Sequence, residues 1–130
     1  MTKAIDTCVV ARIIAQDDPE QTPLAEQALA EPTMIGLSVI LESAWLLTSR
    51  FRMARSDVAE SLIDLIDLPT VSCEQESLAR WAISRFADGA DMGDMIHLVS
   101  ARHTQAFRTF DQSIIQEAGA DTPVPIELIA

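Results

Sequence analysis

The sequence has little positive charge. Nine lysine and arginine residues stand against 20 aspartate and glutamate residues, and the net charge at pH 7 is −11. Broad binding of phosphate backbones needs a basic surface, so this balance argues against nonspecific electrostatic binding of nucleic acids. It favours a cation site or a basic protein partner, although solubilising surface acids account for most of the negative charge.

Long apolar runs are also missing. No stretch of about 18 or more apolar residues is present, which excludes a membrane-spanning helix. Residues Met1–Asp6 lack the apolar segment of a secretion signal, so we expect a cytoplasmic protein. The two cysteines, Cys8 and Cys73, have no metal-ligand spacing, and free thiols are their expected state in that compartment.

Several catalytic motifs are absent. The chain has no nucleophile-elbow serine and no glycine-rich phosphate loop. A phosphoaspartyl phosphatase needs a second aspartate two residues after Asp6, where this chain has Cys8. A receiver domain needs a late lysine, whereas the only lysine here is Lys3. These absences argue against each of those classes.

Short apolar runs alternate with amphipathic stretches along the chain. Its 130 residues, 48% of them apolar, fit one domain over residues 1–130 with one core. The alternation predicts an α/β domain with a mostly parallel sheet. We expect strands at residues 3–6, 33–36, 70–72, 106–109 and 124–128. We expect helices at residues 8–15, 23–30, 38–50, 56–67, 75–87, 92–103 and 112–118, with Ser38 and Ser56 as N-caps.

Four carboxylates interrupt segments that otherwise resemble buried core: Asp6, Glu42, Asp94 and Asp111. Asp6 ends the first predicted strand, and Asp111 directly follows the fourth. Glu42 is about one turn into a predicted helix, and Asp94 lies in the first turn of another, three residues after Asp91. Ligands of open parallel sheets bind outside the carboxyl ends of the strands, so these acids are expected to converge there.

Each acid also has an ordinary structural explanation. Asp6 and Asp111 could cap the helices that follow them, and Asp94 could be a first-turn acid favoured by the helix dipole. Glu42, expected to be partly buried on a largely apolar helix face, could pair with an arginine. His97 shares a helix face with Asp94, but a histidine there is more often a structural donor than a ligand.

Convergence of the acids would require a cation. Two carboxylates about 4 Å apart repel by roughly 4 kcal/mol at an effective dielectric of about 20. Sites built only from oxygen ligands favour Mg²⁺ or Mn²⁺. Such an ion can activate water and stabilise the charge that grows on a phosphodiester. We therefore predict that Asp6, Glu42, Asp94 and Asp111 are the metal ligands and catalytic acids of a metal-dependent hydrolase.

Taken in order, these residues resemble the PIN domain family, and specifically its VapC-type toxin ribonucleases. The matching segments are Ile5-Asp6-Thr7, Asp17-Asp18-Pro19-Glu20, Ser38–Leu47 with Glu42 and Trp45, Gly89–His97 with Asp91 and Asp94, and Thr109-Phe110-Asp111. The resemblance covers nearly the whole chain. It implies a three-layer sandwich in which helices flank a central, mostly parallel sheet of four or five strands.

The resemblance also implies roles for individual residues. Asp6, Glu42 and Asp94 match the core metal-binding acids of the family, and Asp111 matches a fourth, more variable acid. The supporting positions are an accessory acid at Asp91 and hydroxyl residues at Thr7 and Thr109. The family cleaves RNA with Mg²⁺ or Mn²⁺, commonly as a homodimer, and a cognate antitoxin, expected here to be basic, silences it.

Cys8 departs from the family pattern, because many relatives have asparagine there. A thiol donates and accepts hydrogen bonds poorly, so the support of Asp6 is weakened. The alternative function is a catalytically impaired PIN-like module that acts mainly by binding a basic antitoxin. Arg50, Arg52 and Arg55 form the densest basic cluster, which either steers an RNA backbone or simply ends a helix before a solvated turn.

Overall fold

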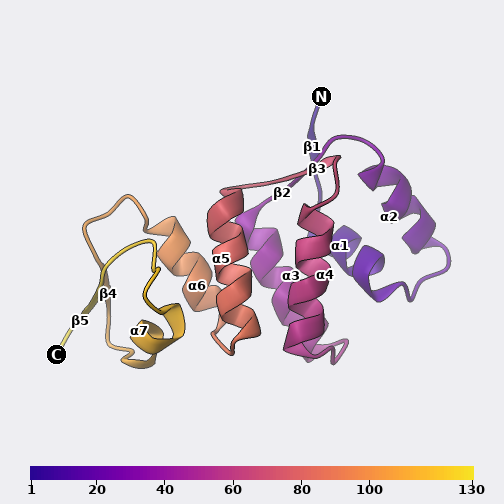
Figure 1. The fold of residues 1–130 in the computed structure, drawn as a ribbon. Coiled ribbons are helices and arrows are strands. Elements are labelled where there is room, and N and C mark those ends of the chain that lie inside the picture. Colours follow the sequence, from indigo (N-terminus) through magenta and orange to yellow (C-terminus); the bar gives the residue numbers. More distant parts are fainter.

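The computed structural model describes residues 1–130 and contains seven helices and five short strands (Figure 1). The strands are β1 (Lys3–Ala4), β2 (Thr33–Ile35), β3 (Val71–Cys73), β4 (Phe107–Thr109) and β5 (Ile126–Leu128). The helices are α1 (Thr7–Ala15), α2 (Gln21–Leu29), α3 (Leu37–Ser49), α4 (Arg55–Ile66), α5 (Glu76–Ala87), α6 (Met92–Ser100) and α7 (Ser113–Ala118). None of the helices has the length and apolar character needed to cross a membrane.

All strand pairing is parallel, which confirms the predicted α/β class. β2 lies between β1 and β3, with Lys3 opposite Thr33 and Thr33 opposite Val71. β4 and β5 pair only with each other, with Phe107 opposite Ile126. The strands are therefore divided between two sheets, whereas the resemblance implied a single central sheet.

The two sheets lie at different ends of the array of helices, and α5 and α6 stand between them (Figure 1). The C-terminal segment is fixed in this position by apolar side chains, since Ile114, Ala118 and Val124 belong to the main hydrophobic core. Arg85 on α5 adds a polar anchor, because its Nε donates a 2.7 Å hydrogen bond to the carbonyl of Glu117. This packing holds β4 away from β1.

The core forms between the helices and the three-stranded sheet. Val58, Leu62, Leu65 and Ile66 are buried and form the inner face of α4. Leu47 on α3 is also fully buried. Removing such aliphatic side chains from water is the main source of stability, so the helix faces fix the orientation of α3, α4 and α6.

Two predicted helix caps are wrong. α3 begins at Leu37 and α4 at Arg55, so neither Ser38 nor Ser56 is an N-cap. Glu74, beyond the end of β3, caps α3 instead: its Oε1 accepts a 2.9 Å hydrogen bond from the Leu37 amide. A carboxylate at a helix N-terminus also complements the helix dipole, and this one ties the ends of β2 and β3 together.

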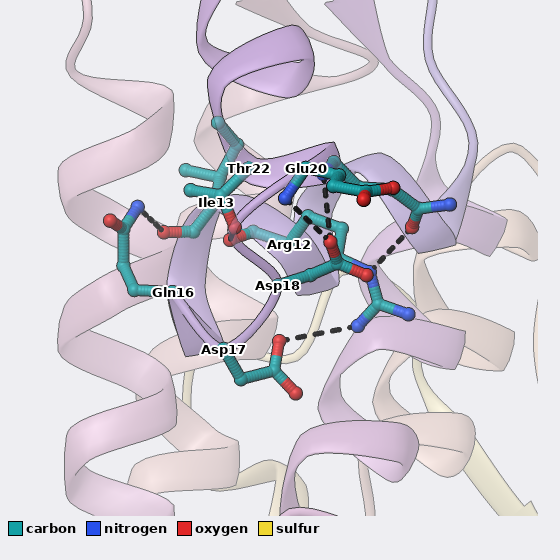
Figure 2. A network of polar contacts seen from close by, with 8 residues as sticks. Arg12, Ile13, Gln16, Asp17, Asp18, Glu20 and Thr22 are labelled. Atoms are coloured by element: carbon teal, nitrogen blue, oxygen red, sulfur yellow. Dashed lines mark hydrogen bonds and ion pairs between the residues drawn. The ribbon is translucent and has the colours of Figure 1, made fainter.

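A polar network closes the turn between α1 and α2 (Figure 2). Arg12 donates a 2.8 Å hydrogen bond to Oε1 of Gln21 and forms a 3.3 Å ion pair with Asp17. Asp18 accepts hydrogen bonds from the amides of Glu20 and Gln21, which satisfies donors at the start of α2. The acidic Asp17–Glu20 segment therefore has a structural role in this turn.

Candidate active site

Asp6 lies two residues beyond β1, at the N-cap of α1. Its Oδ1 accepts a 2.7 Å hydrogen bond from the Thr7 amide, so one carboxylate oxygen is used to cap the helix. The Cys8 Sγ lies 3.7 Å from the other oxygen, Oδ2, and is a weak donor. The Thr7 hydroxyl is buried without a hydrogen-bond partner, so Thr7 holds Asp6 through its backbone rather than its side chain.

Asp91 and Asp94 meet at the start of α6. Asp91 is the N-cap, and its Oδ2 accepts a 2.9 Å hydrogen bond from the Asp94 amide. The three-residue spacing places Asp94 in the first turn, where it is half-buried while Asp91 is exposed. This arrangement follows directly from the local sequence, because an aspartate cap bonds the amide of the third helical position.

Asp111 lies two residues beyond β4. Its Oδ1 accepts hydrogen bonds from the Ser113 amide at 2.9 Å and the Ser113 hydroxyl at 2.6 Å. The Asp111 amide in turn donates to the Thr109 hydroxyl at 2.9 Å. The bonds from Ser113 hold the pKa of Asp111 below its usual value, so the carboxylate stays charged.

Asp94, Asp91 and Asp111 form an electrostatically coupled group. Burial raises the pKa of Asp94, and the negative charges of Asp91 and Asp111 raise it further, whereas His97 opposes the shift. Neither Asp6 nor Glu42 is among the charges that act on Asp94. The acids of α6 and of the segment after β4 therefore lie close together, whereas no group of three acids that includes Asp6 or Glu42 is close enough to hold one ion.

Glu117 on α7 joins this group, and sequence reasoning missed it. Burial raises its pKa, Asp94 is the next largest cause, and the charge of Asp111 adds to the shift. Its Oε2 atom is buried and accepts no hydrogen bond. Glu117 comes near Asp94 only through the packing of α7, and no local motif marks it in the sequence.

Glu42 is exposed, which corrects the expectation of partial burial. Its neighbour Trp45, on the same helix face, is also 59% exposed. The apolar pattern of α3 overstated how much of that face is covered, because the buried side is formed by Leu37, Ile40, Ala44 and Leu47. Glu42 is therefore on the uncovered side of α3, and the residue before it, Leu41, packs near Gly93 at the start of α6.

The acid group has the right chemistry for a hard divalent cation but an incomplete geometry. Its ligands would be carboxylate oxygens, and the unpartnered Oε2 of Glu117 is the kind of atom that a bound cation satisfies. However, no three histidine, cysteine, aspartate or glutamate side chains lie close enough to hold one ion.

The family model for the PIN domain matches residues 3–119. The chain belongs to the PIN domain family. No curated protein and no solved structure matches it. The PIN domain is a nuclease fold whose members generally depend on divalent metals, and the match includes all the predicted acids, from Asp6 to Asp111.

Arg55 of this PIN domain has a structural role near the acids. Its Nη1 donates to the carbonyls of Phe86 at 2.9 Å and Ala90 at 2.7 Å, and its guanidinium lies 4.6 Å from the centre of the Phe86 ring. Arg55 thereby holds the loop that leads into Asp91. All three clustered arginines are exposed, but the Arg55 guanidinium is used in these contacts, so Arg50 and Arg52 are the two that can meet a phosphate backbone.

Proposed function

We propose that this PIN domain is a Mg²⁺- or Mn²⁺-dependent endoribonuclease that hydrolyses RNA phosphodiester bonds. The observation that carries the proposal is the acid group around Asp94: burial raises the pKa of Asp94, and the nearby charges of Asp91 and Asp111 raise it further. Grouped carboxylates with perturbed pKa values mark functional sites more often than ordinary surface acids do, and their mutual repulsion is what a divalent cation removes. Asp6, Glu42, Asp94 and Asp111 are the proposed ligands, with Asp91 and Thr109 as supporting residues.

The test is cleavage of a structured RNA by the purified protein in millimolar Mg²⁺ or Mn²⁺. Cleavage should disappear with EDTA and with Asp94→Asn, because both remove the cation from the acid group. Asp64→Asn is the matched control, since Asp64 is exposed on α4 and outside the acid group. Cleavage that survives both EDTA and Asp94→Asn would refute the proposed function.

We further propose that the protein is the toxin of a VapBC-type pair, silenced by a basic antitoxin. The net charge of −11 would attract such a partner and speed its association. A groove between α1 and α2, lined by Val9, Ala25, Ala28 and the 62% exposed Leu24, offers an apolar surface for its anchoring side chain.

The antitoxin proposal is tested with the product of a short neighbouring reading frame that encodes a small basic protein. That protein should suppress RNA cleavage in a salt-sensitive manner, and Leu24→Glu should weaken suppression without changing cleavage by the free enzyme. Suppression by the basic protein that is equally strong for the Leu24→Glu variant would exclude this groove as the binding site.

The second candidate function is that of a catalytically impaired binding module. It is favoured by Cys8, because the thiol beside Asp6 is a weak hydrogen-bond donor. Calorimetric titration with Mn²⁺ separates the two candidates. Binding at millimolar metal or below that is lost in Asp94→Asn supports the enzyme, whereas the absence of any binding supports the module.

A further inference from the structure

A pocket between α3 and the start of α6 contains an exposed tryptophan, and we call it the Trp45 pocket. The residues that matter here are Leu41, Trp45 and Thr48 of α3, Asp91 and Gly93 at the start of α6, and Arg55. The volume of the pocket is about 200 Å³. Pockets for drug-sized ligands measure about 300 to 1,000 Å³, so this one suits a single flat ring system rather than a whole nucleotide.

Trp45 lies close to two of the proposed metal ligands along the chain. It follows Glu42 by three residues, which puts it on the same helix face and about 4.5 Å further along the axis. Across the pocket, Asp91 caps the helix that carries Asp94. The Trp45 side chain is 59% exposed, so its ring is open to a ligand that reaches the acids.

The polar groups of the Trp45 pocket are fixed before a ligand binds. Arg55 is held by the carbonyls of Phe86 and Ala90, which it contacts through Nη1, and this leaves Nη2 and Nε for a further acceptor. Asp91 uses Oδ2 to cap α6, which leaves Oδ1 for a further donor. A few fixed polar groups beside an apolar wall are typical of a site for a ring with hydrogen-bonding edges.

Gly93 keeps the α6 side of the pocket open. A Cβ atom at this position would lie 3.0 Å from Oδ2 of Asp91 and 3.6 Å from Cδ1 of Leu41, and both of these residues line the pocket. A side chain at Gly93 would therefore project into the space beside Asp91. Without one, a flat ring can approach the backbone at the start of α6.

The charges of the chain favour an RNA base as the occupant over another protein surface. The core of a protein interface is depleted of charged residues, whereas Arg55 and Asp91 both line this pocket. The net charge of −11 and the two available arginines, Arg50 and Arg52, allow few phosphate contacts. Part of the affinity for RNA must then come from its bases, and stacking on an aromatic ring supplies it without positive charge.

We propose that the Trp45 pocket binds an unpaired nucleobase of the RNA substrate, stacked on Trp45, next to the phosphate held at the acid group. The inference rests on the proposed function and narrows its substrate class to RNA with unpaired nucleotides at the cleavage position. A base within a duplex is paired and stacked between its neighbours, so it cannot enter the pocket unless it is flipped out.

The first experiment measures binding and needs no catalysis. It uses a single-stranded oligoribonucleotide and the Asp94→Asn protein, in which the RNA should stay intact. Trp81→Phe is added so that Trp45, the only other tryptophan, reports on the pocket by its fluorescence. The single-stranded RNA should quench this emission, and a duplex of the same sequence should not. Emission that the single-stranded RNA leaves unchanged overturns the proposal.

The second experiment measures affinity. Trp45→Ala should weaken binding of the single-stranded RNA about 5- to 100-fold, as expected for the loss of one stacked base. Trp45→Phe should weaken it less, because it keeps a flat ring. The loss should be similar at low and high salt, since stacking releases no counterions. Leu68→Ala is the matched control, because Leu68 is an exposed apolar residue outside the pocket, and it should bind RNA like wild type.

Equal binding of the single-stranded RNA by wild type and Trp45→Ala overturns the proposal. If sedimentation also shows that Trp45→Ala turns a dimer into monomers, the exposed ring belongs to a contact between copies instead. Cleavage that is abolished by EDTA but unchanged in Trp45→Ala contradicts the pocket and leaves the proposed function supported. A wild type that binds RNA through Trp45 but does not cleave it contradicts the proposed function and leaves the pocket supported.

Discussion

Replacing Arg55 with alanine should destabilise the protein and disorganise the start of α6. The side chain donates to two carbonyls, those of Phe86 and Ala90, and lies over the Phe86 ring. A net contribution of about 1 kcal/mol for each of the two hydrogen bonds and about 0.5 to 1 kcal/mol for the cation–π contact gives a loss of about 2.5 to 3 kcal/mol. The value for each bond is below the range for hydrogen bonds to buried charged groups, because Arg55 is an exposed residue.

The assay is reversible urea unfolding, supported by thermal melting. For a chain of this size, about 3 to 5 °C of melting temperature corresponds to 1 kcal/mol, so Arg55→Ala should melt about 8 to 15 °C below wild type. Arg55→Lys should recover part of the loss, because an ammonium group keeps the charge but lacks the planar fork. Arg50→Ala is the control, since Arg50 is exposed and should change stability by less than about 0.5 kcal/mol.

The same variant should lower RNA cleavage at temperatures where it is still folded, because the Ala90 carbonyl directly precedes Asp91, the cap of α6. If Arg55→Ala unfolds at the same urea concentration as Arg50→Ala, the two hydrogen bonds contribute no net stability. The argument that Arg55 organises the loop before the acids would then be wrong.

Three further predictions concern single acids and their neighbours. Asp94→Asn should raise the free energy of unfolding in EDTA at pH 7. The raised pKa of Asp94 means that the fold disfavours its charged form, so the stability of the wild type falls as pH rises through that pKa. Urea unfolding at pH 7 and at pH 4 should therefore show the gain in stability only at pH 7. Cys8→Asn should increase the rate of RNA cleavage several-fold, because an amide donates a stronger hydrogen bond to Asp6 than the thiol, whose Sγ lies 3.7 Å from the carboxylate. Unchanged steady-state kinetics would show that Cys8 does not limit activity. Hydrogen bonds from the amides of Gln21 and Glu20 lower the pKa of Asp18, so the Asp18 carboxylate stabilises the fold above its unfolded-state pKa and loses this effect as pH falls through its folded-state pKa. Between pH 7 and pH 3, the melting temperature should therefore decrease less for Asp18→Ala than for wild type.

The helices and the order of elements could be predicted from the sequence because they depend on local patterns. The inner face of α4, with Val58, Leu62, Leu65 and Ile66, follows from helical periodicity alone. The caps made by Asp6 and Asp91 are also local, since each carboxylate bonds an amide of the next few residues.

What could not be predicted depends on contacts between distant segments. Glu74 caps α3 from a position 37 residues away in the sequence, so the prediction of Ser38 as the N-cap from the local sequence was wrong. Glu117 reaches Asp94 only because α7 packs on the core. The exposure of Glu42 depends on which neighbours cover α3, and a periodic pattern cannot supply that information.

In the proposed site, local sequence patterns and contacts between distant segments both determine where the acids lie. Asp6 and Asp111 occupy similar places, because each lies two residues beyond a short strand and accepts a hydrogen bond from a nearby backbone amide, and this local similarity is visible in the sequence. Whether their carboxylates meet depends on whether β1 pairs with β4, which no local pattern encodes. A strand of two or three residues makes few backbone bonds, so the pairing energy of either edge is small and a cation held between the acids could determine it. A cation bound between the acids would then hold them together as well as serve the chemistry, and titrations of thermal stability and of cleavage against Mn²⁺ should have the same midpoint.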